Sequence, residues 1–365
     1  MKKTFFIILI FALAILPLVT CSDPIFYAVS REIAQREPLI KGSPTNFVEF
    51  DDNIFDGAMY VASGKNIWKY KNGSWSSHGQ NRWIAQLAAT EKFLYALCDD
   101  NSVIRFDPSL SPSYSVISNA KSIFAAKDVL FFSNNEGNDS YSISYRDDSG
   151  ATGVIATGVS MLKGAAYDGV DTYYLSTNGS GTFCINENSL DLAERINNDT
   201  NFIGIISLDT SSTPHTVVGI TRNGNLHRIT SSGISSITGF DDRLANGALA
   251  LWRKDKNNSL YPALLLAGRQ DRLTYTADSG YTYGYQELVL DETTGEISGS
   301  SFNEPGKASP STVGSDNESY MSSLGKNPVN HIFQAKDGVL FASTQKNGVW
   351  SYRERDGLWQ WNAED

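Results

Sequence analysis

The sequence predicts an all-β protein built as a β-propeller, most simply with seven four-stranded blades. The prediction rests on a strand unit that recurs along the chain, on a spacing of about 40 residues between its copies, and on turn residues between the strands. Each copy has a short apolar run ending in small residues, then a polar turn, then an alternating strand. The apolar runs centre on Tyr60, Tyr95, Phe131, Tyr174, Val217, Leu265 and Phe341, at steps of 35, 36, 43, 43, 48 and 76.

The residue types in each copy suit this architecture. The apolar runs are nearly continuous, as is typical of strands that are covered on both faces. In the next strand of the first copy, Trp68 and Tyr70 fall on one face and lysines on the other. Asn-Gly pairs at 223–224 and 347–348 favour tight hairpin turns, which need positive φ.

The uneven spacing leaves the blade count partly open. The last step fits one blade with a Ser-rich insertion at about 298–325, and six or eight blades remain alternatives to seven. A pair of β-sandwiches is the competing architecture, but regular spacing disfavours it. Residues 25–29 could supply an outer strand that closes the ring, although the last unit holds four strands of its own.

The N-terminus has the parts of an export signal. Lys2 and Lys3 precede an uninterrupted apolar run at 5–19, which is short for a membrane-spanning helix. We therefore expect a signal peptide at 1–20, an N-terminal tether at 21–43 and a propeller at 44–365. An uncleaved anchor helix is the alternative.

Leu18-Val19-Thr20-Cys21 resembles the bacterial lipobox. Thr20 departs from the Gly, Ala or Ser that usually precedes the cysteine, a departure that spirochaete lipoproteins tolerate. The resemblance implies that Cys21 becomes the acylated first residue, carrying palmitate-type chains, and that the protein is anchored in a bacterial cell envelope. Several acyl chains anchor firmly where one binds marginally. A soluble secreted product is the alternative.

The last unit resembles the two-component-regulator propeller repeat. The matching positions are Phe341, Ser343, Thr344, Gly348, Trp350, Tyr352, Gly357 and Trp359. The match covers about 35 residues and decays in earlier units. The segment Asp23–Tyr27, placed directly after the cysteine and before a propeller, also resembles the treponemal lipoproteins. Neither resemblance implies catalytic residues.

Composition limits the partners. The chain has 30 basic and 40 acidic residues, and removing 1–20 leaves 28 against 40. An acidic chain without a polybasic stretch disfavours nucleic acid and leaves the lipid on Cys21 as the expected membrane attachment. Cys98 and Cys184 lie in strand-like runs two units apart, so we expect buried, unpaired thiols rather than a disulfide.

No complete catalytic motif or metal site is recognisable, and we expect no cofactor. The four histidines are scattered singly, which is typical of surface or blade-packing residues. Ser160 and Lys163 match the Ser-x-x-Lys motif of penicillin-recognising enzymes, and residues 315–317 match their Ser-Asp-Asn motif. In those enzymes the Ser and Lys share a helix face, whereas here the first motif lies in a β-repeat and the second in a Ser-rich loop. Two segments have some of the oxygen ligands of a calcium loop but not the full set. One begins at Asp255 and has alternating oxygen ligands after it, and the other is 134–139.

Aromatic residues are the candidate binding groups. Tyr281, Tyr283 and Tyr285 alternate, which places three rings on one strand face. If exposed, these rings could stack on sugars or anchor a protein; otherwise they pack between blades. Trp359 and Trp361 could likewise be exposed for binding or packed between blades.

The sequence therefore indicates a lipid-anchored envelope β-propeller, at the periplasmic face or the cell surface, that works as a non-catalytic protein-binding or scaffold module. The insertion at 298–325 is expected to carry a contact. One alternative is a glycan- or peptide-processing enzyme with acidic residues in the central channel. Another is an outer-membrane assembly accessory with an edge that accepts a partner strand.

Overall fold

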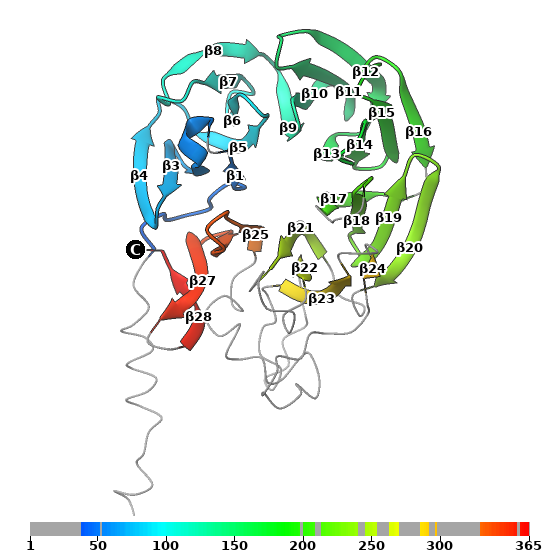
Figure 1. The fold of residues 1–365 in the computed structure, drawn as a ribbon. Coiled ribbons are helices and arrows are strands. Elements are labelled where there is room, and N and C mark those ends of the chain that lie inside the picture. The colour runs from blue at the N-terminus through cyan, green and yellow to red at the C-terminus, as the bar shows by residue number, and fades with distance from the viewer. Residues whose placement is uncertain are drawn as a thin grey trace, which may run out of the picture. The chain divides into compact units, whose positions relative to one another are not determined.

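In the computed structural model, four-stranded antiparallel sheets stand as blades around a central axis (Figure 1). The structure describes residues 38–51, 53–197, 200–208, 213–239, 245–253, 263–269, 285–291, 296–297, 329–355 and 358–364. Seven such sheets lie within these residues, which confirms the predicted seven-bladed propeller. Each blade uses four consecutive strands of the chain.

The strands of the first four blades are as follows. Blade 1 has β1 (Val48–Glu49), β2 (Met59–Ser63), β3 (Asn66–Lys71) and β4 (Ser74–Gly79), with the 3-10 turn η1 (Phe55–Gly57) between β1 and β2. Blade 2 has β5 (Ile84–Ala89), β6 (Leu94–Cys98), β7 (Val103–Phe106) and β8 (Pro112–Ile117). Blade 3 has β9 (Ala120–Ala126), β10 (Val129–Gly137), β11 (Ser140–Asp147) and β12 (Thr152–Val159). Blade 4 has β13 (Leu162–Tyr167), β14 (Thr172–Thr177), β15 (Thr182–Asn186) and β16 (Ala193–Asn197).

Three further blades complete the ring. Blade 5 has β17 (Phe202–Leu208), β18 (Thr216–Thr221), β19 (Asn225–Thr230) and β20 (Gly233–Gly239). Blade 6 has β21 (Ala245–Trp252), β22 (Ala263–Arg269), β23 (Tyr285–Asp291) and β24 (Glu296–Ile297). Blade 7 has β25 (Val329–Gln334), β26 (Leu340–Thr344), β27 (Val349–Arg355) and β28 (Leu358–Ala363).

The apolar run of each repeat is the second strand of a blade, and its two faces pack against different neighbours. In β2, Met59 and Val61 pack in the cluster shared with blade 7, whereas Tyr60 and Ala62 pack in the cluster shared with blade 2. Such a strand needs apolar side chains on both faces. Hydrophobic clusters fill all seven interfaces between neighbouring blades.

The turn between the second and third strands explains the Ser-Thr and Asn-Gly signals. In blade 7 the Thr344 hydroxyl accepts a hydrogen bond from Asn347 N at 2.9 Å and donates one to Gly348 O at 3.0 Å. Gly348 has φ of +75° and Gly224, in the equivalent turn of blade 5, has φ of +80°. Glycine adopts this left-handed conformation without the steric cost that a side chain brings. The predicted tight turns are therefore confirmed.

Among the described strands none is exchanged to close the ring, because blades 1 and 7 each contain four consecutive strands. Residues 38–47, here named the closing segment, run from blade 7 to blade 1. Within this segment Ile40 O accepts a hydrogen bond from Val349 N at 3.2 Å, and Gly42 O accepts one from Gly348 N at 3.0 Å. The end of the predicted tether, 38–43, therefore lies against the propeller.

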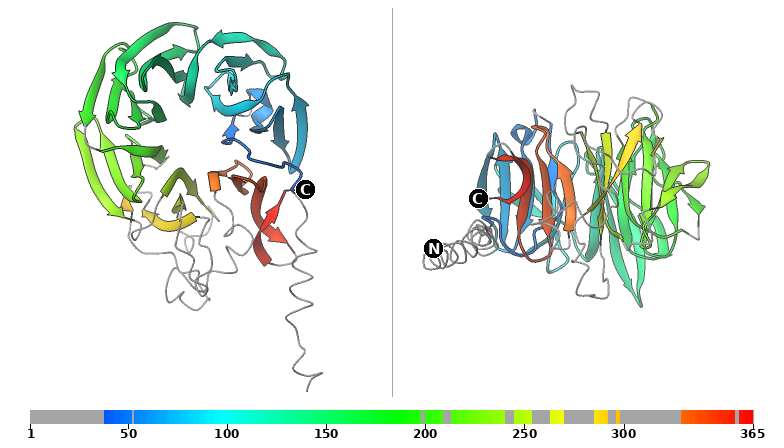
Figure 2. Two further views of the ribbon diagram at one scale, coloured as in Figure 1. Left: turned by 180° about the vertical axis from the view of Figure 1, so that it is seen from behind. Right: turned by 90° about the horizontal axis from the view of Figure 1, so that it is seen from below.

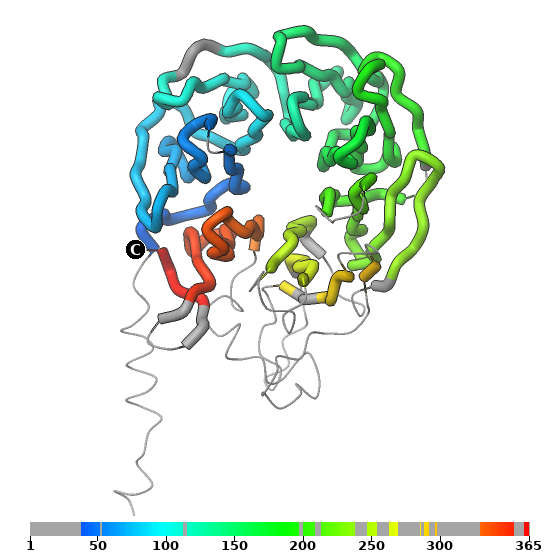
Figure 3. Tube along the Cα trace, viewed as in Figure 1, coloured from blue at the N-terminus to red at the C-terminus, as the bar shows by residue number. Residues whose placement is uncertain are grey.

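Side chains complete this closure. The Tyr70 hydroxyl donates to Asp337 Oδ2 at 2.7 Å, and the Trp75 indole nitrogen donates to Glu364 Oε2 at 2.6 Å. Both bonds join blade 1 to blade 7, so the first and last blades lie side by side (Figures 2 and 3). Residues 25–29, the predicted closing strand, lie outside the described residues.

The predicted cysteine state is confirmed. Cys98 in β6 and Cys184 in β15 are both buried and free. Among the described residues there is no helix long and apolar enough to cross a membrane. The segments predicted as signal peptide, 1–20, and as insertion, 298–325, lie outside the described residues.

Candidate functional site

The candidate site is the central channel, a cavity of about 710 Å³. Its described wall comes from the innermost strands β5, β9, β13, β17, β21 and β25 and from the closing segment. These strands converge at the ring's axis in Figure 1. The lining residues are mostly apolar, so the polar ones decide what the channel can bind.

Side-chain amides in the channel wall fasten neighbouring blades to one another. Asn46 donates to Leu87 O at 2.7 Å and accepts from Leu87 N at 3.0 Å. Gln86 in turn forms the same two-way hydrogen-bonded pair with the backbone of Ile123, accepting from its N–H at 3.1 Å. Each amide therefore satisfies both backbone groups of a residue in the next blade's inner strand. We call this arrangement an amide clamp.

A third amide clamp has the opposite direction, because its amide bonds the blade that precedes it in the chain. Gln334 of β25 accepts from Arg253 N at 2.9 Å and donates to Arg253 O at 2.9 Å, joining blade 7 to blade 6. Between blades 3 and 4 two serine hydroxyls replace the amide. The Leu162 backbone donates to Ser133 Oγ at 2.8 Å and accepts from Ser122 Oγ at 3.0 Å.

Glycines allow closer contact where there is no clamp. A Cβ at Gly204 of β17 would overlap the carbonyl oxygen of Gly247 in β21, and a Cβ at Gly164 would overlap the Ile205 side chain. Gly247 also has φ of +91°, which disfavours any other residue. Blades 5 and 6 thus approach through backbone contact near the axis, and blades 4 and 5 approach through the Gly164 backbone and the Ile205 side chain.

His331 joins blade 7 to the closing segment. Its Nδ1 accepts a hydrogen bond from Phe47 N at 3.2 Å, and its ring lies 5.9 Å from the Phe47 ring and 6.4 Å from the Phe333 ring, centroid to centroid. Burial lowers the pKa of His331 to about 4. The imidazole is therefore neutral at neutral pH, with its proton on Nε2 because Nδ1 acts as the acceptor. His331 fits the predicted role of a blade-packing residue.

Lys163 of β13 is the only other ionisable residue among the described channel-lining residues. Burial lowers the pKa of its ammonium group, since a charge is poorly solvated there. No Asp or Glu belongs to the described part of the lining. The pair of channel carboxylates that the glycan- or peptide-processing alternative requires thus has no candidate among the described residues.

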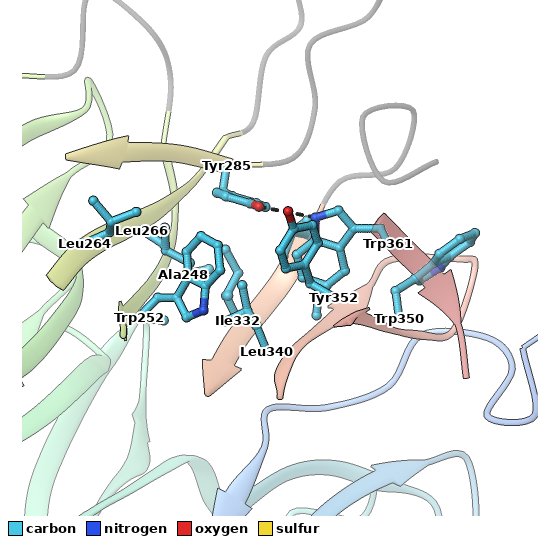
Figure 4. Close-up of a cluster of buried hydrophobic side chains, with 13 residues drawn as sticks. Ala248, Trp252, Leu264, Leu266, Tyr285, Ile332, Leu340, Trp350, Tyr352 and Trp361 are labelled. Carbon is cyan, nitrogen blue, oxygen red and sulfur yellow. Dashed lines mark hydrogen bonds between the residues drawn. The ribbon is translucent and has the colours of Figure 1, made fainter. Parts of the chain in front are cut away.

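The predicted aromatic binding residues are placed as follows. Tyr285 of β23 and Trp361 of β28 are each only 3% exposed, and the Trp361 indole donates to the Tyr285 hydroxyl at 3.2 Å between blades 6 and 7 (Figure 4). Both rings fill the interface, so neither presents an exposed stacking surface. Trp359 lies in β28, paired in register with Glu354, while Tyr281 and Tyr283 lie outside the described residues.

The Ser-x-x-Lys motif at 160–163 and the segment 134–139 show no catalytic arrangement. Ser160 interacts through its backbone N–H and its hydroxyl with Ser180 Oγ, at 2.8 and 3.1 Å, whereas Lys163 lines the channel on a strand. At 134–139 the Asn135 side chain accepts from Gly137 N at 2.8 Å, an ordinary polar turn. Residues 255–259 and 315–317 lie outside the described residues. The described residues contain no cluster of three or more His, Cys, Asp or Glu side chains that could hold a metal ion.

The repeat pattern does not predict the clamps or the channel position of Lys163. The pattern follows the second and third strands, whose apolar residues are conspicuous, and passes over the innermost strands. A usable signal exists in blade 4, where the alternating run 162–167 precedes the apolar strand. A strand in that position must face the axis, so its single lysine enters the channel wall.

No protein-family model matches the chain, and no curated protein matches it in sequence. Several solved structures share its fold. The extracellular domain of a hybrid two-component system from B. thetaiotaomicron matches with a TM-score of 0.51 and 14% identity, over 86% of this chain and 38% of that one. The WD40 β-propeller domain of Doa1 matches at 0.54 and 8%, over 88% and 97%. A streptogramin B lyase matches at 0.53 and 12%, over 86% and 94%.

These similarities establish the propeller fold. The neighbour from the two-component system agrees at the level of fold with the repeat resemblance of the last unit, and this chain spans well under half of that neighbour. The neighbours include a lyase as well as a WD40 domain, so the shared fold does not assign a reaction.

Proposed function

We propose that this chain is a lipid-anchored envelope protein whose propeller recruits a protein partner through one rim. The fold provides a rigid ring on which turns are displayed, as scaffold propellers do. The polar groups of the channel wall that form the clamps, such as Gln86, serve to hold blades together. The rim is then the surface on which a partner makes its contacts.

One observation carries this proposal: two exposed apolar side chains lie in turns on one rim of blade 4. Leu192 is 75% exposed and Val170 is 49% exposed. Val170 and Leu192 precede β14 and β16, in turns that an up-and-down sheet places on the same face. We name Val170 and Leu192 the rim patch.

Apolar groups grouped on a surface are typical of sites where proteins associate. The patch is flanked by charged residues, since Lys127 pairs with Glu187 at 2.6 Å beside the Val170 turn. A polar rim around apolar contacts is the usual anatomy of a protein interface.

Native electrophoresis of detergent-solubilised membranes tests partner recruitment. The wild-type protein is expected to migrate in a complex larger than its own mass, and L192K to release it. W83K is the matched control, because Trp83 is 57% exposed but lies in the β4–β5 connection on the opposite face. Migration of the wild type at its own mass, or an equal effect of both variants, would contradict the proposal.

Detergent phase partition tests the anchor. The wild type is expected to enter the detergent phase, and Cys21→Ser to enter the aqueous phase after export, because serine cannot carry the thioether-linked lipid. Equal partition of both proteins would refute acylation at Cys21.

A further inference from the structure

We propose that the central channel binds a small ligand with one anionic group and an apolar body, held by the ammonium group of Lys163. This site goes beyond the proposed function, because the partner protein would contact the rim patch and this ligand would occupy the channel.

The first support is an unbalanced charge. Lys163 alternates along β13 with the buried residues Leu162 and Gly164 and lies in the channel lining. It has no described hydrogen-bond or ion-pair partner, and the described lining has no carboxylate. The chain has 40 acidic and 30 basic residues, so acidic side chains are more abundant than basic ones. The described channel nevertheless holds a cation and no acidic side chain beside it. An anionic ligand would supply the missing counter-charge.

The second support is the state of the other polar lining groups. Asn46, Gln86 and Gln334 are engaged with backbone groups in the amide clamps. The acceptor nitrogen of His331 is occupied by Phe47 N. Asn330, which also lines the channel, uses its side-chain NH2 on Ser43, Pro44 and Thr344. Lys163 is the one charged donor of the described lining, and its three N–H groups select an anion.

The third support is the shape and character of the wall. The inner strands of blades 3 and 5 lie on either side of Lys163. They contribute Phe124, Ile203 and Ile205 to the lining. The volume of about 710 Å³ falls in the range of small-molecule sites. An aromatic or aliphatic carboxylate matches both the cation and the apolar walls.

Isothermal titration calorimetry of the full chain in detergent provides the test, with 4-phenylbutyrate as the anionic probe and 4-phenylbutanamide as its uncharged counterpart. We expect saturable binding of 4-phenylbutyrate with a Kd of about 1 mM or tighter. The amide and the K163M variant should bind at least about tenfold more weakly, whereas K163R should retain binding. K121M is the matched control, because Lys121 is exposed on β9 and lies outside the lining.

A second readout locates the site. Acetic anhydride should acetylate Lys163 in the free protein, and 4-phenylbutyrate should protect Lys163 but not Lys121, as followed by peptide mass spectrometry. The proposal is overturned by the lack of both saturable binding and protection, or by equal affinity of the wild type for the acid and the amide. It is also overturned if K163M, shown to be folded by circular dichroism, binds as the wild type does.

Discussion

The indole nitrogen of Trp75 donates a 2.6 Å hydrogen bond to the carboxylate of Glu364, joining the outer strand of the first blade to the last residue that the structure describes. Glu364 is 5% exposed and also accepts hydrogen bonds from Ser351 and Arg353 within blade 7. The buried carboxylate thus has a cationic partner and full hydrogen bonding, as its burial requires. Within the described residues, side chains and the closing segment close the ring.

Trp75→Phe should destabilise the protein, because it removes the hydrogen bond to a buried carboxylate while keeping an aromatic ring. We expect the free energy of unfolding to fall by about 1–3 kcal/mol. Urea denaturation followed by circular dichroism measures it. The exposed Trp83→Phe is the control and should change little; equal losses in both would show that the bond does not hold the ring closed.

Gly348→Ala should be more destabilising than Gly338→Ala. Both glycines have positive φ, +75° and +90°, so both variants carry a conformational cost of roughly 1–2 kcal/mol. Only Gly348 is also crowded, because its Cβ would meet the Ile40 carbonyl and Pro38, whereas the Cβ at Gly338 would meet open space. Thermal melting of the two variants isolates this contact. Identical melting temperatures would contradict the packing of the closing segment.

Gln86→Met should break the amide clamp between blades 2 and 3 and leave the N–H and C=O of Ile123 without their partner. The expected loss of stability is about 1–3 kcal/mol. Hydrogen exchange at the Ile123 amide should accelerate as well, which a general packing effect elsewhere would not produce. The control is Gln345→Met, at an exposed turn position. Unchanged exchange at Ile123 would argue against the clamp.

Stability should fall as the pH is lowered below neutrality, owing to His331. Its pKa is lowered from 6.5 to about 4 by burial, so the unfolded chain binds a proton in that interval while the folded chain does not. The contribution is complete above about pH 6.5, is lost as the pH falls towards 4, and amounts to on the order of 3 kcal/mol.

His331→Asn isolates this effect, since an asparagine oxygen can accept from Phe47 N but does not titrate. Urea midpoints measured between pH 4 and pH 7 should depend less steeply on pH in His331→Asn than in the wild type. His78→Asn, on outer strand β4, serves as the control. Parallel profiles for the wild type and His331→Asn would exclude His331 as the source.

The blades could be predicted from the sequence because their second strands face two interfaces at once. Phe131 and Leu130 of β10, for example, pack in the clusters shared with blades 4 and 2, respectively, so the whole run is apolar. The turns were predictable for a similar reason, because Gly348 and Gly224 need positive φ. Local requirements of this kind leave a visible mark in a single sequence.

The channel could not be predicted in the same way. Gln86 and Ile123 are 37 residues apart and belong to different blades, so their pairing depends on how the blades are placed around the axis. Likewise, Tyr285 and Trp361 could be read as exposed or buried, because alternation shows which residues share a face but not what covers it. The structure places both rings in the interface between blades 6 and 7.

Photo-crosslinking in living cells tests most directly the central claim that one rim recruits a partner protein. A benzophenone amino acid would be introduced in place of Leu192 and, as the control on the opposite face, in place of Trp83. The account predicts one covalent adduct of defined mass from the Leu192 position and none from the Trp83 position. The absence of an adduct at Leu192, or the same adduct from both positions, would contradict it.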